Sequence, residues 1–277
     1  MLRTILVGLD GSSYSAAAVE LGIRWAQKCN AMLVGVGIID EPTIRKPELL
    51  PIGGSFYKEH RDDALVADAR RRVEQFLGKF SLQCAEAGVA CKLLEDIGLP
   101  WEQICLEAQR YDLILLGQQT YFHFETQQDA DETLSKVLMA VPRPVVTVPE
   151  HLESGRSVVV AYDGSLQATR TLQAFQALRL DPSLQVHVVS VHANHLQAAR
   201  HADRAVEFLG FHEIEAQPHA IATSSAPASV IIEQAHQFGA QLVVMGAHGR
   251  PSLREFWCGS VTQTMLRAKK VALFLYH

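Results

Sequence analysis

The sequence is short of cysteine and has no long apolar run. Its 277 residues include five cysteines and no C-x-x-C pair. This pattern argues against a disulfide framework or a zinc knuckle and predicts reduced thiols in a cytoplasmic protein. No run of about 18 apolar residues could span a membrane. The apolar start of the chain ends at Asp10, which predicts a first strand rather than a signal peptide. We therefore expect a cytoplasmic protein with no membrane partner.

The chain also has little net charge, and that charge is unevenly distributed. The formal net charge of −5 argues against general nucleic-acid binding, which needs basic surface. Residues 1–150 hold 15 Lys and Arg against 21 Asp and Glu, whereas residues 151–277 hold 10 against 9. A polyanionic ligand would therefore meet less repulsion in the second half.

An internal repeat is present, which is the first feature to seek in a chain of this length. The segment TILVGLDGS matches SVVVAYDGS and places Asp10 on Asp163. Further along, DLILLGQQT matches QLVVMGAHG and places Gly117 on Gly246. The first half carries extra sequence after its second apolar run, and the Pro and Gly residues of EPTIRKPELLPIGGSFY predict a loop there.

Each half alternates apolar runs of strand length with segments of helical spacing, which indicates parallel strands buried on both faces. The sequence predicts an α/β protein of two tandem Rossmann-like, doubly wound domains, residues 1–150 and 151–277, each with a five-stranded parallel sheet. The polar stretch 149–156 suits the linker between them. The fifth apolar runs, PVVTVP and VALFLY, would each be an exposed edge, so we expect them to pair across the two halves.

One motif in the second half points to phosphate binding. Ligands of open α/β sheets bind at the carboxyl ends of the strands, where the strand order reverses. There the sequence has Gly246-x2-Gly249-x9-Gly259-Ser260. Glycines let backbone amides approach a phosphate, and a helix that starts at Gly259-Ser260 favours an anion at its N-terminus. Arg250 follows the second glycine and is placed to face phosphate charge.

These features resemble the universal stress protein family over essentially the whole chain. The shared features are the repeated V-x-x-D-G-S strand end, the glycine motif and the closing apolar strand. The resemblance implies the tandem form, in which two domains of one chain mimic the family's usual dimer. It further implies that ATP, with or without Mg²⁺, is held in the C-terminal domain. Asp163 would hold the adenosine part, and the Val191 backbone would contact the adenine edge. The ribose and phosphates would contact Gly246, Gly249, Gly259 and Ser260.

The first half departs from this pattern. It keeps the Asp10-Gly11-Ser12 turn but has Thr120 where the second half has a glycine. Ala130-Asp131 replace Gly259-Ser260, so a carboxylate stands at the helix start where a phosphate would bind. We therefore expect a degenerate nucleotide motif in the first domain and one ATP per chain.

The leading hypothesis is a nucleotide-dependent regulatory protein of the stress response. Its protein partner stays unnamed, its tandem domains form an internal pseudo-dimer, and a homodimer is left open. The alternative is a slow ATPase or another ATP-consuming enzyme of related architecture. We assign no catalytic residue, because no Walker lysine follows the glycine motif. An ATP pyrophosphatase would need an S-G-G-x-D-S loop, which the chain lacks. A third hypothesis is a flavin electron carrier, which the absence of yellow colour in the purified protein would exclude.

Three weaker patterns have simpler explanations. His192, His195 and His201 could be metal ligands, but loop histidines are commoner, so we assign no metal site. Asp10 and Asp163 lack a recognisable catalytic partner, which favours a binding role. The run Arg70-Arg71-Arg72 is typical of the solvated face of a helix.

Overall fold

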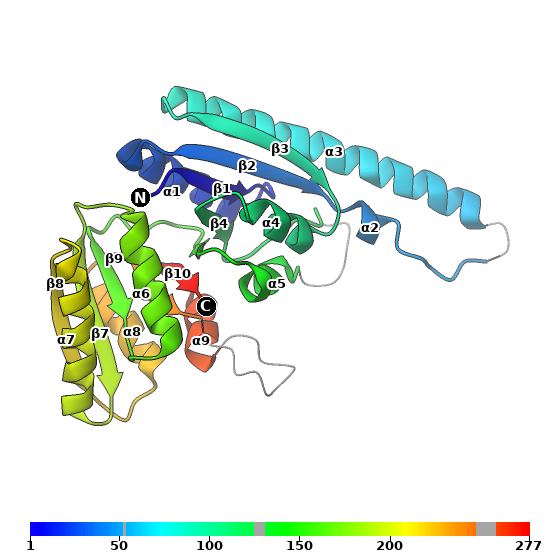
Figure 1. The fold of residues 1–277 in the computed structure, drawn as a ribbon. Helices are drawn as coiled ribbons and strands as arrows, with labels where there is room; N and C mark the ends of the chain where they lie inside the picture. The colour runs from blue at the N-terminus through cyan, green and yellow to red at the C-terminus, as the bar shows by residue number, and fades with distance from the viewer. Residues whose placement is uncertain (52–53, 125–130, 248–258) are drawn as a thin grey trace.

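The structure is a computed structural model that describes residues 1–51, 54–124, 131–247 and 259–277. Helices and strands alternate along the chain (Figure 1). The elements of the first half are β1 (Thr4–Gly8), α1 (Ser13–Cys29), β2 (Met32–Ile39), α2 (Glu41–Ile44), α3 (Gly54–Glu86), β3 (Cys91–Ile97), α4 (Pro100–Ala108), β4 (Leu113–Gly117), α5 (Thr133–Ala140) and β5 (Val145–Val148). Those of the second half are β6 (Ser157–Ala161), α6 (Leu166–Leu178), β7 (Gln185–His192), α7 (His195–Phe211), β8 (Ala216–Ala222), α8 (Pro227–Gln237), β9 (Ala240–Gly246), α9 (Ser260–Ala268) and β10 (Ala272–Tyr276).

The strands form one ten-stranded sheet in the order β3-β2-β1-β4-β5-β10-β9-β6-β7-β8. Within each half the five strands are parallel, and the two halves meet where β5 runs antiparallel to β10. Thr147 pairs there with Leu273. The two doubly wound domains and the pairing of the fifth strands, both predicted from the sequence, are confirmed.

Side chains that alternate along each strand fill two buried layers, one on each face of the sheet. In β1, Ile5 and Val7 belong to one cluster and Leu6 to the other. Helices α1, α3, α6 and α7 contribute to the first cluster, and α4, α5, α8 and α9 contribute to the second. Each half is therefore covered by helices on both faces.

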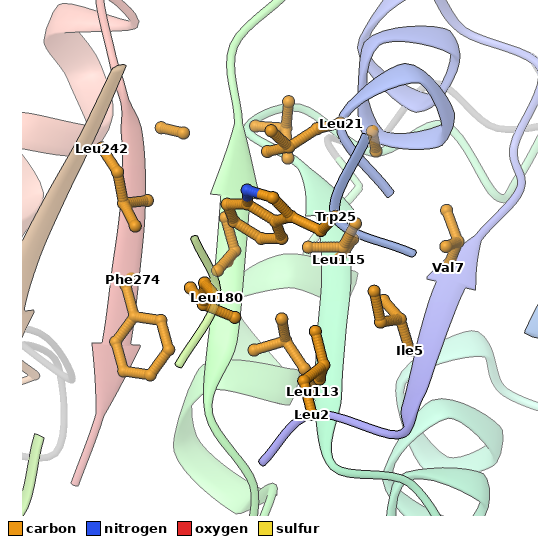
Figure 2. Close-up of a cluster of buried hydrophobic side chains, with 14 of the residues drawn as sticks. Leu2, Ile5, Val7, Leu21, Trp25, Leu113, Leu115, Leu180, Leu242 and Phe274 are labelled. Atoms are coloured by element: carbon orange, nitrogen blue, oxygen red, sulfur yellow. The ribbon is translucent and has the colours of Figure 1, made fainter. Parts of the chain in front are cut away.

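The first layer continues from one half into the other. Trp25 of α1 lies in the same buried cluster as Leu180, Leu242 and Phe274 of the second half, and Figure 2 shows these side chains together. The backbone N–H of Leu2 also donates to the Leu178 carbonyl at 3.0 Å. The halves thus share a core as well as a sheet.

The segment EPTIRKPELLPIGGSFY is where the sequence-based expectation was partly wrong. Its first four residues form the short helix α2, whose N-terminus is capped by Asp40 through the Thr43 N–H at 3.1 Å. Its last four residues already belong to α3, which runs for 33 residues and extends past the sheet in Figure 1. The predicted loop is therefore limited to the residues between these two helices.

The linker between β5 and β6 holds Gly155 against the backbone of the second half. A Cβ at this position would lie 1.6 Å from the carbonyl oxygen of Gly239. We expect Gly155→Ala to lower the free energy of unfolding by about 1–3 kcal/mol, since backbone must shift to admit a methyl group. Chemical denaturation measures this change. Gly210→Ala in α7 is the control, because a Cβ there meets nothing within 4 Å. An equal result for both variants would contradict the close approach.

Candidate functional site

A cavity of about 640 Å³ opens at the carboxyl ends of the strands in the second half. It lies where β6 and β9 are neighbours in the sheet. From β6 the chain continues to β7 on one side, and from β9 it continues to β10 on the other side. This is the topological switch point of the sheet, where open α/β proteins bind ligands. Its lining includes five of the seven residues predicted to bind a ligand, namely Asp163, Val191, Gly246, Gly259 and Ser260.

Asp163 begins the Asp163-Gly164-Ser165 turn that follows β6. Among the described residues, its carboxylate accepts a hydrogen bond only from the Ser165 N–H, at 2.9 Å. Ser165 in turn caps α6, accepting from the Ala168 N–H at 3.2 Å. Asp163 is exposed to solvent at the mouth of the cavity. Its carboxylate is therefore placed to accept a hydrogen bond from a hydroxyl-bearing ligand.

Val191 turns its backbone polar groups toward the cavity. The carbonyl of Val189 accepts from the Tyr162 N–H at 3.0 Å and so points toward β6. The carbonyl of His192 accepts from the Thr223 N–H at 3.2 Å and so points toward β8. The N–H and C=O groups of successive residues in a strand point to opposite sides. Those of Val191 therefore point to the same side as the Val189 carbonyl, toward β6. Because β6 ends at Ala161, opposite Val189, no residue of β6 lies beside Val191. Within the described ranges no loop or cap hydrogen bond uses its N–H or C=O, so both are placed to meet the edge of a planar ligand.

Glycines bring the backbone close to the cavity at two places. A Cβ on Gly246 would lie 2.8 Å from the backbone nitrogen of Ala168, so a side chain does not fit at the end of β9. Gly259 is the N-cap of α9 and supplies no side chain to its first N–H groups. These donors and the helix dipole face the cavity beside Ser260, which suits an anion. Gly249 and Arg250 lie outside the described residues.

The remaining wall is largely apolar. Val189, Ile231 and Met245 belong to the buried cluster on this face of the sheet, and they also line the cavity. An apolar pocket with a few converging polar groups is typical of sites for planar organic ligands. The cavity thus combines an apolar slot, a backbone edge, a carboxylate and a helix N-terminus.

The corresponding place in the first half is filled by the chain itself. Phe122, five residues after the end of β4, is 1% exposed and belongs to the cluster that contains Ile38 and Ile104. In the repeat these two residues correspond to Val191 and Ile231. A Cβ on Gly8, at the end of β1, would lie 3.0 Å from the Phe122 ring. The aromatic ring therefore occupies the apolar slot that is open in the second half.

Asp10 of the first half is buried and hydrogen-bonded within the chain, whereas its counterpart Asp163 is exposed at the cavity. Asp10 is 5% exposed, and its carboxylate accepts from the Ser12 hydroxyl at 2.6 Å, the Ser12 N–H at 2.9 Å and the Tyr121 N–H at 2.7 Å. Burial raises the pKa of the Asp10 carboxyl, and these hydrogen bonds lower it in part. Both carboxylate oxygens are thus used within the chain, one of them by the loop that carries Phe122.

Asp131 holds this loop from the other side. Its carboxylate accepts from the Phe122 N–H and from the Thr133 N–H of α5, each at 2.8 Å. His123 lies between two carboxylates, with Nδ1 2.7 Å from Asp40 and Nε2 4.0 Å from Asp131. The hydrogen bond with Asp40 raises the pKa of His123. An internal carboxylate thus occupies the helix N-terminus that would otherwise face a phosphate.

Sequence reasoning found Asp131 but missed the role of Phe122 and its neighbours. The available signal was the run Tyr121-Phe122-His123-Phe124, because three aromatic rings are out of place in a phosphate-binding loop. Phe124 is also buried, and its ring lies 5.8 Å from that of Phe76. The loop therefore packs into the core instead of cradling a ligand.

The described residues offer no group of three or more His, Cys, Asp or Glu side chains placed to hold a metal. The rings of His192 and His201 lie 6.4 Å apart at nearly a right angle, and His192 Nδ1 accepts from the Asn194 N–H. In the same described part of the chain, no helix is both long enough and apolar enough to cross a membrane.

The fold and the crevice define a tandem α/β protein with two repeats of one doubly wound architecture. The sequence model of the universal stress protein family matches residues 1–149 and again residues 155–277, so the chain belongs to that family. A universal stress protein of Synechocystis is 22% identical, over 99% of this chain and 100% of its own length.

A solved structure shows the same fold over almost the whole chain. A universal stress protein from Archaeoglobus fulgidus superposes with a TM-score of 0.72 at 19% identity, covering 98% of this chain and 97% of the other. A shorter universal stress protein, solved in complex with cAMP, covers 54% of this chain and 98% of its own, with a TM-score of 0.37 and 18% identity.

Proposed function

We propose that this chain binds one molecule of ATP, with or without Mg²⁺, in the crevice of its second half and acts as a nucleotide-dependent regulatory protein of the stress response. The observation that carries the proposal is the open 640 Å³ cavity at the switch point, where Asp163, Val191, Gly246, Gly259 and Ser260 meet. Its volume lies within the range of about 300–1,000 Å³ that is usual for small-molecule sites.

Each part of ATP has a counterpart in the cavity. The apolar slot of Val189, Ile231 and Met245 suits the flat base, and the backbone of Val191 suits its polar edge. The carboxylate of Asp163 suits the ribose hydroxyls. The N-terminus of α9 at Gly259 suits the phosphates. Mg²⁺ would be held chiefly by phosphate oxygens and water, as is common for nucleotide-bound magnesium.

The state of the cysteines supports the proposal of a cytoplasmic protein that keeps its thiols reduced. The four cysteines in the described part of the chain are free, which fits a reducing compartment. A regulatory protein needs a partner that responds to its nucleotide state, and the partner's identity does not follow from the cavity. Since β5 and β10 already pair within one chain, a homodimer would have to use another surface.

Gly259→Asp tests the proposal. The new carboxylate would lie at the N-terminus of α9. There it would repel the phosphates and compete with them for the first N–H groups of the helix. We expect the Kd for ATP, measured by calorimetry, to rise at least tenfold, which is about 1.4 kcal/mol. Gly210→Asp is the matched control, because it adds the same charge to the same half at an exposed helix position. Equal Kd values for both variants would refute the site.

Phosphate release from ATP, measured on the same purified proteins, separates a regulatory protein from an ATP-consuming enzyme. In the described lining of the cavity, Asp163 is the one carboxylate and there is no lysine to clamp the phosphates. Sustained phosphate release faster than about 1 s⁻¹, the low end of ordinary enzymes, would assign the chain to the ATP-consuming class instead.

A further inference from the structure

The strands that the structure describes leave two edges of the sheet open, β8 in the second half and β3 in the first. In β8 the backbone blocks further pairing. The Thr223 N–H donates to the His192 carbonyl of β7, so Thr223 and every second residue before it face β7. Pro218 is therefore one of the residues that face outward, and it has no N–H to offer another strand.

Strand β3 has no such block, because it contains no proline and pairs with β2 in one register over its whole length. The Leu33 N–H of β2 donates to the Ala90 carbonyl at 2.9 Å, and the Gly98 N–H donates to the Ile39 carbonyl of β2 at 3.0 Å. Even-numbered residues of β3 therefore bond to β2, and odd-numbered residues turn their N–H and C=O groups outward. The outward residues are Cys91, Leu93, Glu95 and Ile97.

The side chains along β3 combine opposite charges with exposed apolar groups. Leu93 and Ile97 are 43% and 48% exposed on one face of the strand. Lys92 and Asp96 lie on the other face, where Lys92 is exposed and Asp96 is half-buried. In the described part of the chain, Oδ2 of Asp96 has no hydrogen-bond partner. The edge thus offers a cation, an anion and two apolar side chains to whatever pairs with it.

We propose that β3 pairs with β3 of a second copy of this chain, antiparallel about a two-fold axis at Leu94, so that two sheets join into one. In this register Cys91 lies opposite Ile97 of the second copy, and Leu93 lies opposite Glu95. Every outward residue is then in a hydrogen-bonded pair, in which the two residues exchange both of their backbone hydrogen bonds. This contact lies at the outer edge of the first half and does not depend on the nucleotide crevice (Figure 1).

The same register suits the side chains. Lys92 lies opposite Asp96 of the second copy in a non-hydrogen-bonded pair, where side chains approach most closely. The two-fold axis repeats this pair of opposite charges, and such cross-strand pairs stabilise a sheet. On the other face, Leu93 is the diagonal neighbour of Leu93 and Ile97 of the second copy, within reach of apolar contact. The edge of β3 is therefore complementary to itself.

The neighbouring registers lack this match. An axis at Glu95 would place two Glu95 carboxylates directly opposite each other, which is destabilising. An axis at Leu93 would place Lys92 opposite Leu94 and leave Ile97 beyond the end of the second strand. The axis at Leu94 is the one of these three that pairs both the charges and the outward backbone.

Sedimentation equilibrium of the full chain measures the dimer Kd. Lys92→Asp would turn both cross-strand pairs of opposite charge into pairs of like charge. We expect the dimer Kd to rise at least tenfold, which is about 1.4 kcal/mol. Lys92→Asp combined with Asp96→Lys exchanges the two charges and should restore the wild-type Kd. Gln217→Asp is the control, because it adds a carboxylate at an exposed position of the other edge strand and should leave the Kd unchanged.

Residue-resolved amide hydrogen exchange identifies the surface that is used. The outward N–H groups of Leu93 and Glu95 should be protected above the dimer Kd and lose this protection below it. The Leu94 N–H, which faces β2, should be protected at both concentrations. A chain that stays monomeric up to millimolar concentration would overturn the proposal. So would a charge exchange that fails to restore the dimer, or outward amides that exchange equally fast in monomer and dimer.

Discussion

Calorimetric titration of the whole chain with ATP is expected to give one micromolar site per chain and no second site tighter than about 1 mM. In the first half, a base could enter the apolar slot only by displacing Phe122, and losing a buried phenylalanine costs about 3–5 kcal/mol. The triphosphate would also meet the Asp131 carboxylate. Two like charges about 4 Å apart repel by about 4 kcal/mol at a partly buried site. A thousandfold change in affinity is about 4 kcal/mol, so either effect is sufficient.

A single variant assigns the site that is observed. If the bound ATP lies in the second half, Gly259→Asp should weaken or remove the only measurable binding, and no other site should replace it. Two micromolar sites in the wild type would show that the loop from Tyr121 to Phe124 leaves the first crevice on binding. The filled crevice would then be one conformation of a working site.

Phe122→Ala is expected to destabilise the protein by about 3–5 kcal/mol, the usual cost of removing a buried aromatic ring from a core. The ring is 1% exposed and packs near Gly8 and Leu116, and a cavity would remain in its place. The measurement is the free energy of unfolding from chemical denaturation. The surrounding loop is also held by Asp10 and Asp131, which limits its ability to collapse into the space.

Phe211→Ala is the matched control for this prediction. Phe211 ends α7 and is 78% exposed, so its replacement should change stability by less than about 0.5 kcal/mol. A loss below about 1 kcal/mol for Phe122→Ala would indicate that the ring contributes little to the core. The Phe122 ring would then be too weakly packed to keep a base out of the first crevice.

Most of the fold could be predicted because buried parallel strands have a strong sequence signal. Runs such as TILVG and SVVVA are apolar on both faces, and their repetition reveals the two halves. The pairing of β5 with β10 followed from the need to cover an apolar edge. The start of α3 was less predictable, because Pro and Gly near a helix end indicate a loop until tertiary contacts are known.

The candidate site could be predicted where the residue type and spacing indicate it, and was missed where packing decides. Gly246, Gly259 and Asp163 were predicted from their identity and spacing, and all three line the cavity. Phe122 fills the first crevice only because the loop after β4 turns inward, and nothing in the spacing of that loop gives its direction. The direction of the Val191 peptide likewise depends on where the neighbouring strand β6 ends.

The antiparallel joint between β5 and β10 has a consequence for synthesis of the chain. Thr147 and its partner Leu273 are 126 residues apart in sequence, so the ribosome makes β10 long after β5. At about 5–20 residues per second this interval lasts roughly 6–25 s. Throughout it, the first half can fold, yet one side of β5 has no partner strand. An uncovered strand edge readily pairs with another chain. Two nascent copies on one polysome are therefore most at risk of mispairing through β5, and slow translation of the second half lengthens that exposure.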